Sequence, residues 1–317
     1  MSSPTNALDV RQVSLTYGSF KALNKISLSV APGSLAAVIG PNGAGKSSLV
    51  KAICGRADID SGVIEISGVD SRRRAARLRL GVAPQRSALY AHMTAFENLA
   101  CFGRQAGLSK VRANGRATEV LSMIGMDDDA GTLVSNMSGG MRQRINIAAA
   151  IVHEPALLIL DEPAASLDPD GVQQINELII MLKEGGYGVL LVTHDMNQAQ
   201  VTSDQVIVLR RGGIVSAGPA QALISNACGE KVKLVIDRAC AGELTANGFE
   251  QCPAQAHQCV KFLDCHSLIA DEIASLQKKG VALHSLRIAM PDLNDVVASM
   301  RTGAAHVDDD ARKERVA

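Results

Sequence analysis

The sequence predicts an α/β protein built on an open parallel sheet, and three apolar runs of strand length carry this prediction. The runs are residues 35–39, 157–160 and 189–193, and they end at a glycine, an aspartate and a histidine, respectively. Short continuous apolar runs are typical of strands that are buried on both faces of a sheet. Helical spacing follows the first run over residues 47–53, which gives the order strand, tight turn and helix.

The turn after the first run has the phosphate-binding pattern G-x-x-x-x-G-K-[ST]. Its residues, with the serine that follows, are Gly40, Pro41, Asn42, Gly43, Ala44, Gly45, Lys46, Ser47 and Ser48. Glycines allow backbone N–H groups to face phosphate oxygens, and the helix that begins here adds the positive end of its dipole. Lys46 can reach the β- and γ-phosphates, and the Ser47 hydroxyl can bind Mg²⁺. A glycine loop that arises by chance is the alternative, and the flanking strand and helix disfavour it.

Acidic residues follow the second apolar run and a histidine follows the third. Asp161 can hold Mg²⁺, and Glu162 can polarise a water molecule for in-line attack on the γ-phosphate. His194 can form a hydrogen bond to the same phosphate group. Taken alone, each of these side chains would more simply be interpreted as a polar residue exposed to solvent at the end of a strand. The presence of Lys46 and Ser47 upstream favours the catalytic interpretation of the two carboxylates.

A second glycine turn lies between the first and second apolar runs. It consists of Ser138, Gly139 and Gly140, and it opens the helical run 145–151. A helix that begins at such a turn is another natural phosphate site. Because the chain already has one phosphate loop, this site is surplus unless two chains share each nucleotide.

In type and order these motifs resemble those of the ATP-binding subunits of ABC transporters, over residues 8–222. The resemblance implies a P-loop NTPase fold of ABC type, with an antiparallel β-subdomain and a helical subdomain at about residues 87–150. It also implies further site residues: Tyr17 stacks on adenine, and Gln85 senses Mg²⁺ and the membrane partner. Residues 137–141 form the signature loop, Asp168 belongs to the D-loop, and His194 is the switch histidine.

The resemblance implies ATP and Mg²⁺ as cofactors, with Ser47, Gln85 and Asp161 as the metal ligands. It implies a head-to-tail, two-fold dimer in which each ATP lies between Lys46 of one chain and Ser138 of the other. The other expected partner is a separate transmembrane permease, which would hold the chain at the cytoplasmic face of the cell membrane.

Two features resemble the type-two exporter branch of the family, which moves drugs, polysaccharides or lipids outward. The signature loop ends in Met141 instead of the usual glutamine, and residues 291–296 have the pattern Pro-x-Leu-x-Asp-Val. We therefore expect an exporter motor. Three alternatives remain open: an importer ATPase, a soluble ABC ATPase that acts on DNA or ribosomes, and a scaffold with an inactive cassette. The intact Lys46 and Glu162 disfavour the last of these.

A break at Gly218-Pro219 indicates a second, smaller α/β domain. We expect an ATP-binding domain over residues 1–222, a linker over 223–230, an accessory domain over 231–303 and a disordered tail over 304–317. The accessory domain is expected to contain three strands and two helices.

Composition sets the broad class of the protein. Of its 317 residues, 47% are hydrophobic and 20% are charged, and the net charge is zero, as in ordinary globular proteins. This balance gives no reason to expect binding to nucleic acid or to an anionic membrane, and the basic run 71–79 is interpreted as a solvated helix face. The N-terminal residues lack the pattern of a signal peptide, and no apolar run has the length of a membrane span.

The chain has seven cysteines, an odd number, and no C-x-x-C pair. In a cytoplasmic protein these are most simply reduced thiols. A zinc site is the alternative for one cluster, although its spacing fits no common finger. The cluster consists of Cys252, His257, Cys259, Cys265 and His266.

Overall fold

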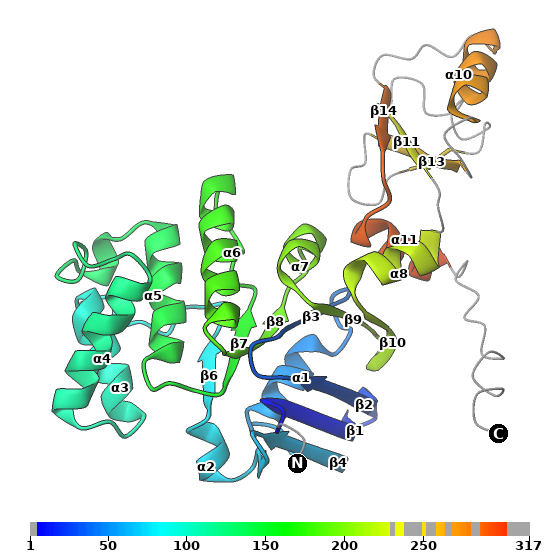
Figure 1. Ribbon diagram of the computed structural model, residues 1–317. Coiled ribbons are helices and arrows are strands. Elements are labelled where there is room, and N and C mark those ends of the chain that lie inside the picture. The colour runs from blue at the N-terminus through cyan, green and yellow to red at the C-terminus, as the bar shows by residue number, and fades with distance from the viewer. Residues whose placement is uncertain are drawn as a thin grey trace. The chain divides into compact units, whose positions relative to one another are not determined.

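The computed structural model describes residues 5–228, 232–237, 249–251, 258–263, 268–279 and 286–302 (Figure 1). By its internal contacts the chain divides into two units, Met1–Pro219 and Ala220–Ala317. The division falls three residues before the predicted end of the ATP-binding domain, and the predicted domain boundaries stay predictions.

A six-stranded sheet of order β10-β9-β3-β8-β7-β6 forms the centre of the first unit. Its strands are β3 (Leu35–Ile39), β6 (Leu80–Ala83), β7 (Leu157–Asp161), β8 (Gly188–Val192), β9 (Gln205–Arg210) and β10 (Gly213–Gly218). All neighbours pair in parallel except β10, which is antiparallel to β9. Every residue of β3 and β8 is buried, as expected for strands that are covered on both faces. The three apolar runs of the sequence are therefore central strands.

An antiparallel sheet of order β2-β1-β4-β5 covers one side of this unit. Its strands are β1 (Leu8–Tyr17), β2 (Phe20–Val30), β4 (Ser61–Ile66) and β5 (Val69–Asp70). Helix α1 (Lys46–Ile53) contributes Leu49 and Ile53 to a core that joins this sheet to β7, β8 and β9. This core holds the start of α1 beside the carboxyl end of β3.

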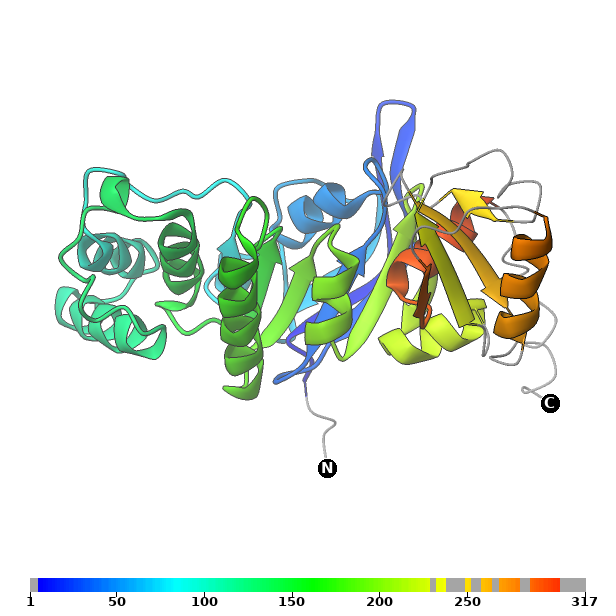
Figure 2. The same cartoon turned by 90° about the horizontal axis from the view of Figure 1, so that it is seen from above.

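The helical part of the first unit gathers on one side of that unit in both views (Figures 1 and 2). It comprises α3 (Ala95–Gln105), α4 (Lys110–Met123), the 3-10 helix η1 (Val134–Asn136) and α5 (Gly139–Ile151). Thr94 and Glu97 form a reciprocal capping box at the start of α3. The remaining helices of this unit are α2 (Arg74–Arg77), α6 (Pro169–Glu184) and α7 (Met196–Thr202). The predicted ABC-type fold class is confirmed.

The second unit is built on an antiparallel sheet of order β12-β13-β11-β14. Its elements are α8 (Ala220–Cys228), β11 (Val232–Asp237), β12 (Glu250–Gln251), β13 (Gln258–Leu263), α10 (Leu268–Lys278), β14 (Leu286–Ala289) and α11 (Leu293–Thr302). Ile236, Cys259 and Leu276 belong to its small core, and α8 contacts α11. Helix α8 occupies most of the segment that the sequence analysis assigned to a linker.

Two of the sequence predictions fall largely outside the described residues. The tail 304–317 lies outside them, as do four members of the proposed zinc cluster, Cys252, His257, Cys265 and His266. Cys259 is described as a buried free thiol. Within the described ranges, no three His, Cys, Asp or Glu side chains are grouped as metal ligands, and none of the helices there has the length and apolar character of a membrane span.

Candidate active site

The carboxyl ends of four neighbouring strands converge on one cavity. Strand β3 leads into the phosphate loop, β8 into His194, and β7 ends at Asp161, while Gln85 lies two residues beyond β6. The strand order β3-β8-β7-β6 places these ends side by side at one edge of the sheet. Side chains from distant parts of the sequence meet there because parallel strands present their carboxyl ends to the same edge.

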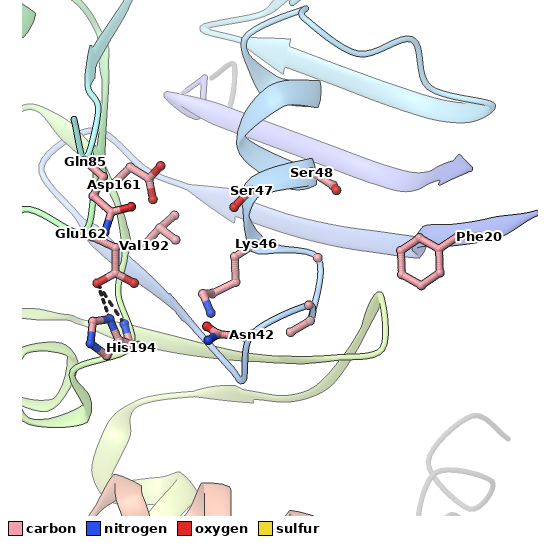
Figure 3. Close-up of a pocket in the computed structure, with 13 residues that line it drawn as sticks. Phe20, Asn42, Lys46, Ser47, Ser48, Gln85, Asp161, Glu162, Val192 and His194 are labelled. Atoms are coloured by element: carbon pink, nitrogen blue, oxygen red, sulfur yellow. Dashed lines mark hydrogen bonds and ion pairs between the residues drawn. The ribbon is translucent and has the colours of Figure 1, made fainter. Parts of the chain in front are cut away.

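The cavity has a volume of about 480 Å³. It is lined by Phe20, Asn42, Gly43, Ala44, Gly45, Lys46, Ser47, Ser48, Gln85, Asp161, Glu162, Val192 and His194. Figure 3 shows Lys46 and Ser47 on one side, with Asp161, Glu162 and His194 opposite them. The phosphate loop and the acidic strand end therefore face each other across a single space.

Two glycines let the phosphate loop pass close to neighbouring backbone. Gly40 has φ +150°, and a Cβ atom added there would lie 2.2 Å from the carbonyl oxygen of Leu209. Gly45 has φ +111°, and its Cβ would lie 2.7 Å from the carbonyl oxygen of Ala22. Only glycine combines these dihedral angles with such close approach. The N–H of Leu49 donates to the Gly45 carbonyl at 2.9 Å and begins the α1 hydrogen-bond ladder.

Lys46 lies folded over its own loop. Its ammonium group donates to the carbonyl oxygens of Gly40, at 2.6 Å, and of Pro41, at 3.3 Å. Partial burial lowers the pKa of Lys46, and the negative charges of Glu162 and Asp161 act in the opposite direction. Gly40 and Pro41 do not line the cavity but hold the amine that does.

Asp161 is a partly buried carboxylate, and among the described residues it forms no ion pair. Burial raises its pKa, the charge of Glu162 raises it further, and the charge of Lys46 lowers it. A cation near Asp161 would relieve both unfavourable effects.

Glu162 is connected to the neighbouring strand through its backbone and its side chain. Its backbone N–H donates to the carbonyl oxygen of Val192 at 2.8 Å. Its carboxylate lies 2.7 Å from His194 Nδ1 and accepts a longer bond, 3.3 Å, from the His194 backbone N–H. Glu162 has φ +52°, an unusual conformation for a residue other than glycine and one that recurs at functional sites. The strand ends thus fix the carboxylate in the cavity wall.

The second glycine turn lies in a separate pocket of about 430 Å³. Ser138, Gly139 and Gly140 line it together with Asp168. The Ser138 hydroxyl caps α5 by accepting from the N–H of Met141 at 3.2 Å, and Asp168 caps α6 in the same way. None of these residues lines the cavity at Lys46, so one chain carries the two predicted phosphate sites in different places.

The aromatic side chain in the cavity wall is Phe20, which the sequence analysis did not single out. Tyr17 does not line the cavity, although it pairs with Phe20 across the turn between β1 and β2. Both side chains are exposed, 45% for Tyr17 and 61% for Phe20. The signal available in the sequence was the short turn Gly18-Ser19, which predicts a hairpin with an aromatic residue on each side.

Comparisons with known proteins agree with this geometry. Residues 23–165 match the ABC transporter family model. The daunorubicin resistance ATP-binding protein DrrA3 of Streptomyces coeruleorubidus is 33% identical over 299 residues, which cover 92% of this chain and 94% of DrrA3. The chain belongs to the ATP-binding proteins of the ABC transporter family. The predicted resemblance is confirmed, and with it the assignment of the chain as an ATPase.

Two further relatives extend the comparison. The Nod factor export ATP-binding protein I of Rhizobium meliloti is 38% identical over 231 residues, covering 72% of this chain and 69% of that protein. A dimeric post-hydrolysis structure of the ATP-binding cassette MJ0796, bound to ADP and Pi, has a TM-score of 0.59 and 26% identity. It covers 67% of this chain and 98% of that cassette.

Proposed function

We propose that this ABC ATPase closes as a two-fold dimer around two ATP molecules and drives a separate permease that exports its cargo. One observation carries the proposal: the residues predicted to bind phosphate lie in two separate pockets of the same chain. A head-to-tail dimer would bring the Lys46 cavity of one copy against the Ser138 pocket of the other, twice, by symmetry.

Within each composite site the loop residues 40–48 would hold the phosphates, with Lys46 as the cation nearest the γ-phosphate. Ser138, Gly139 and Gly140 of the second copy would meet the same phosphate through the start of α5. The hydroxyl of Ser138 accepts from Met141 N–H, which leaves its own O–H free to donate. Asp168 would hold the start of α6 beside that contact.

The donor set of the cavity fits a hard divalent cation. Ser47, Gln85 and Asp161 offer a hydroxyl, an amide oxygen and a carboxylate, which are the oxygen ligands that Mg²⁺ takes beside nucleotide phosphates. Bound Mg²⁺ would neutralise phosphate charge as the bond to the γ-phosphorus breaks. Burial raises the pKa of Asp161, and a cation bound beside it would favour the charged form of the carboxylate.

Glu162 would act as the general base. A water molecule attacks the γ-phosphorus, the bond to the β–γ bridging oxygen breaks, and the Glu162 carboxylate accepts the proton that the water loses. His194 would orient that carboxylate through the 2.7 Å contact and donate to the γ-phosphate as the site closes. The products are ADP and inorganic phosphate.

Export is supported by the relatives. DrrA3 is named for resistance to daunorubicin, and its alignment spans 92% of this chain, so it includes much of the second unit. The Nod factor export protein aligns with 72% of the chain. We propose a transmembrane permease as the partner and the cytoplasmic face of the membrane as the location. An importer ATPase and a soluble ATPase acting on DNA or ribosomes have no comparable support.

The test is the steady-state ATPase rate of Glu162→Gln. We expect kcat to fall by about 10²- to 10⁴-fold with little change in ATP affinity, because the amide keeps the shape of the side chain but cannot accept the proton. Glu184→Gln, an exposed glutamate at the end of α6, is the matched control. A Glu162→Gln chain that hydrolyses ATP at the wild-type rate would remove Glu162 as the base.

A further inference from the structure

The region around α2 carries an unusual density of positive charge. Five of the eight residues 72–79 are arginines, and all five are exposed. We call Arg72, Arg73, Arg74, Arg77 and Arg79 the arginine patch. The net charge of the whole chain is zero, so this density is a local asymmetry that the overall balance conceals.

Few carboxylates offset the patch. Asp70 pairs with Arg72, whose hydrogen bonds to it lower the pKa of Asp70 to about 2, and Asp58 is near enough to act on Arg72 by its charge. Arg79 donates to the carbonyl oxygen of Ser67 at 2.7 Å, and this neutral acceptor does not offset the positive charge of the arginine. In the part of the chain that the structure describes, no ion pair involves Arg73, Arg74 or Arg77.

The patch also contains an exposed apolar side chain. Ala76 is buried and anchors α2, which contacts β5 and β6. Leu78 lies one helical turn after Arg74 and is 48% exposed. Strand β6 is the edge strand of the six-stranded sheet, and Figure 1 shows α2 below this strand, at the lower end of the first unit in that view.

We propose that the arginine patch binds the anionic headgroups of the phospholipid bilayer in which the permease is embedded. Clusters of four to eight arginines or lysines beside a membrane are typical of anionic-lipid binding, and a leucine among them fits the boundary between headgroups and acyl chains. Nucleic acid fits less well, since no aromatic residue lies within 71–79 to stack on bases.

The proposal goes beyond the proposed function but draws on it for proximity. A chain held by a permease remains close to headgroups, so even weak contacts are favoured by high effective concentration. The patch would then bias how the ATPase is oriented at the membrane surface.

The experiment is co-sedimentation of the purified full-length chain with vesicles of phosphatidylcholine, with and without 30% phosphatidylglycerol, at low and at high salt. The test variant combines Arg73→Gln, Arg74→Gln and Arg77→Gln. The control combines Arg104→Gln, Lys110→Gln and Lys278→Gln, which removes three exposed cations elsewhere. We expect wild type and control to bind only the anionic vesicles, and only at low salt. The test variant should lose roughly 100-fold in partitioning, at about fivefold per arginine.

Three results would overturn the proposal: equal binding to neutral and anionic vesicles or none to either, unchanged binding of the test variant, or an equal loss in the control. Tighter binding of wild type to a single-stranded oligonucleotide than to anionic vesicles would reassign the patch to nucleic acid. The ATPase rate of the same samples separates the two claims. An inactive wild type would contradict the proposed function, and the vesicle binding would still test the lipid proposal on its own.

Discussion

Alanine at Gly45 is expected to destabilise the protein far more than alanine at Gly43, two residues earlier in the phosphate loop. A Cβ atom at Gly45 would lie 2.7 Å from the Ala22 carbonyl oxygen and 3.3 Å from a methyl carbon of Leu23. At Gly43, where φ is +78°, a Cβ atom would meet no heavy atom within 4 Å. The pair therefore compares two positive-φ glycines, of which one is in close contact with neighbouring backbone and the other faces open space.

The expected difference follows from these contacts. Both substitutions force alanine into a positive-φ conformation, which costs about 1–2 kcal/mol. At Gly45 the obstructing atom belongs to backbone in β2 and cannot rotate away, so overpacking adds about 1–3 kcal/mol. For a unit of this size that increment lowers the melting temperature by about 2–12 °C relative to Gly43→Ala.

The assay is thermal unfolding of wild type and both variants, followed by far-UV circular dichroism without nucleotide. The absence of ATP matters because a bound ligand would add its own stabilisation and obscure the loop. Equal melting temperatures for Gly43→Ala and Gly45→Ala would refute the reasoning, because the close contact with Ala22 would then cost nothing.

Three other predictions concern single side chains. Tyr17→Ala should weaken ATP binding by about 1–3 kcal/mol in an equilibrium titration; unchanged affinity, combined with a loss in Phe20→Ala, would transfer the stacking role to Phe20. Asn98→Leu should lower the free energy of unfolding, measured in urea, by roughly 3 kcal/mol. The side-chain amide is fully buried, accepts a hydrogen bond from Tyr90 N–H at 2.8 Å and donates one to the Tyr90 carbonyl oxygen at 3.0 Å. A free energy of unfolding equal to that of wild type would contradict this prediction. The Mg²⁺-dependent affinity for ATP should fall as the pH is lowered, because protons compete with Mg²⁺ for Asp161, and this fall should begin at a higher pH than for an ordinary aspartate, since the pKa of Asp161 is raised. Asp161→Asn should abolish this pH dependence, and a pH dependence that persists in Asp161→Asn would assign the effect to another group.

Local patterns were sufficient to predict the framework of the site. The apolar run before Gly40 and the helix after Lys46 are β3 and α1, and the run before Asp161 is β7. Such segments are recognisable because burial on both faces of a parallel sheet demands continuous apolar residues. The glycine pattern predicts a phosphate loop because few other sequences tolerate its backbone angles.

Contacts that depend on tertiary packing were not predictable in this way. Nothing local to Asn98 indicates that its amide group binds the backbone of Tyr90, eight residues earlier. Phe20 lines the cavity because strand β2 passes close to the phosphate loop, where the carbonyl oxygen of Ala22 approaches Gly45. The stretch 223–230 lacks strong periodicity, yet most of it forms α8, which contacts α11. In each case tertiary packing decides the outcome.

The measurement to make is a complementation of ATPase activity between two inactive variants. Lys46→Ala removes the phosphate-loop cation, and Ser138→Asp puts a negative charge against phosphate while keeping a residue that caps α5. Each variant alone should be inactive, since both sites of its homodimer lack one half. A mixed dimer would join the intact Lys46 of one chain to the intact Ser138 of the other in one site. An equimolar mixture should then recover about a quarter of the wild-type rate if the sites are independent. A mixture no more active than either variant alone would contradict a nucleotide site shared between two chains.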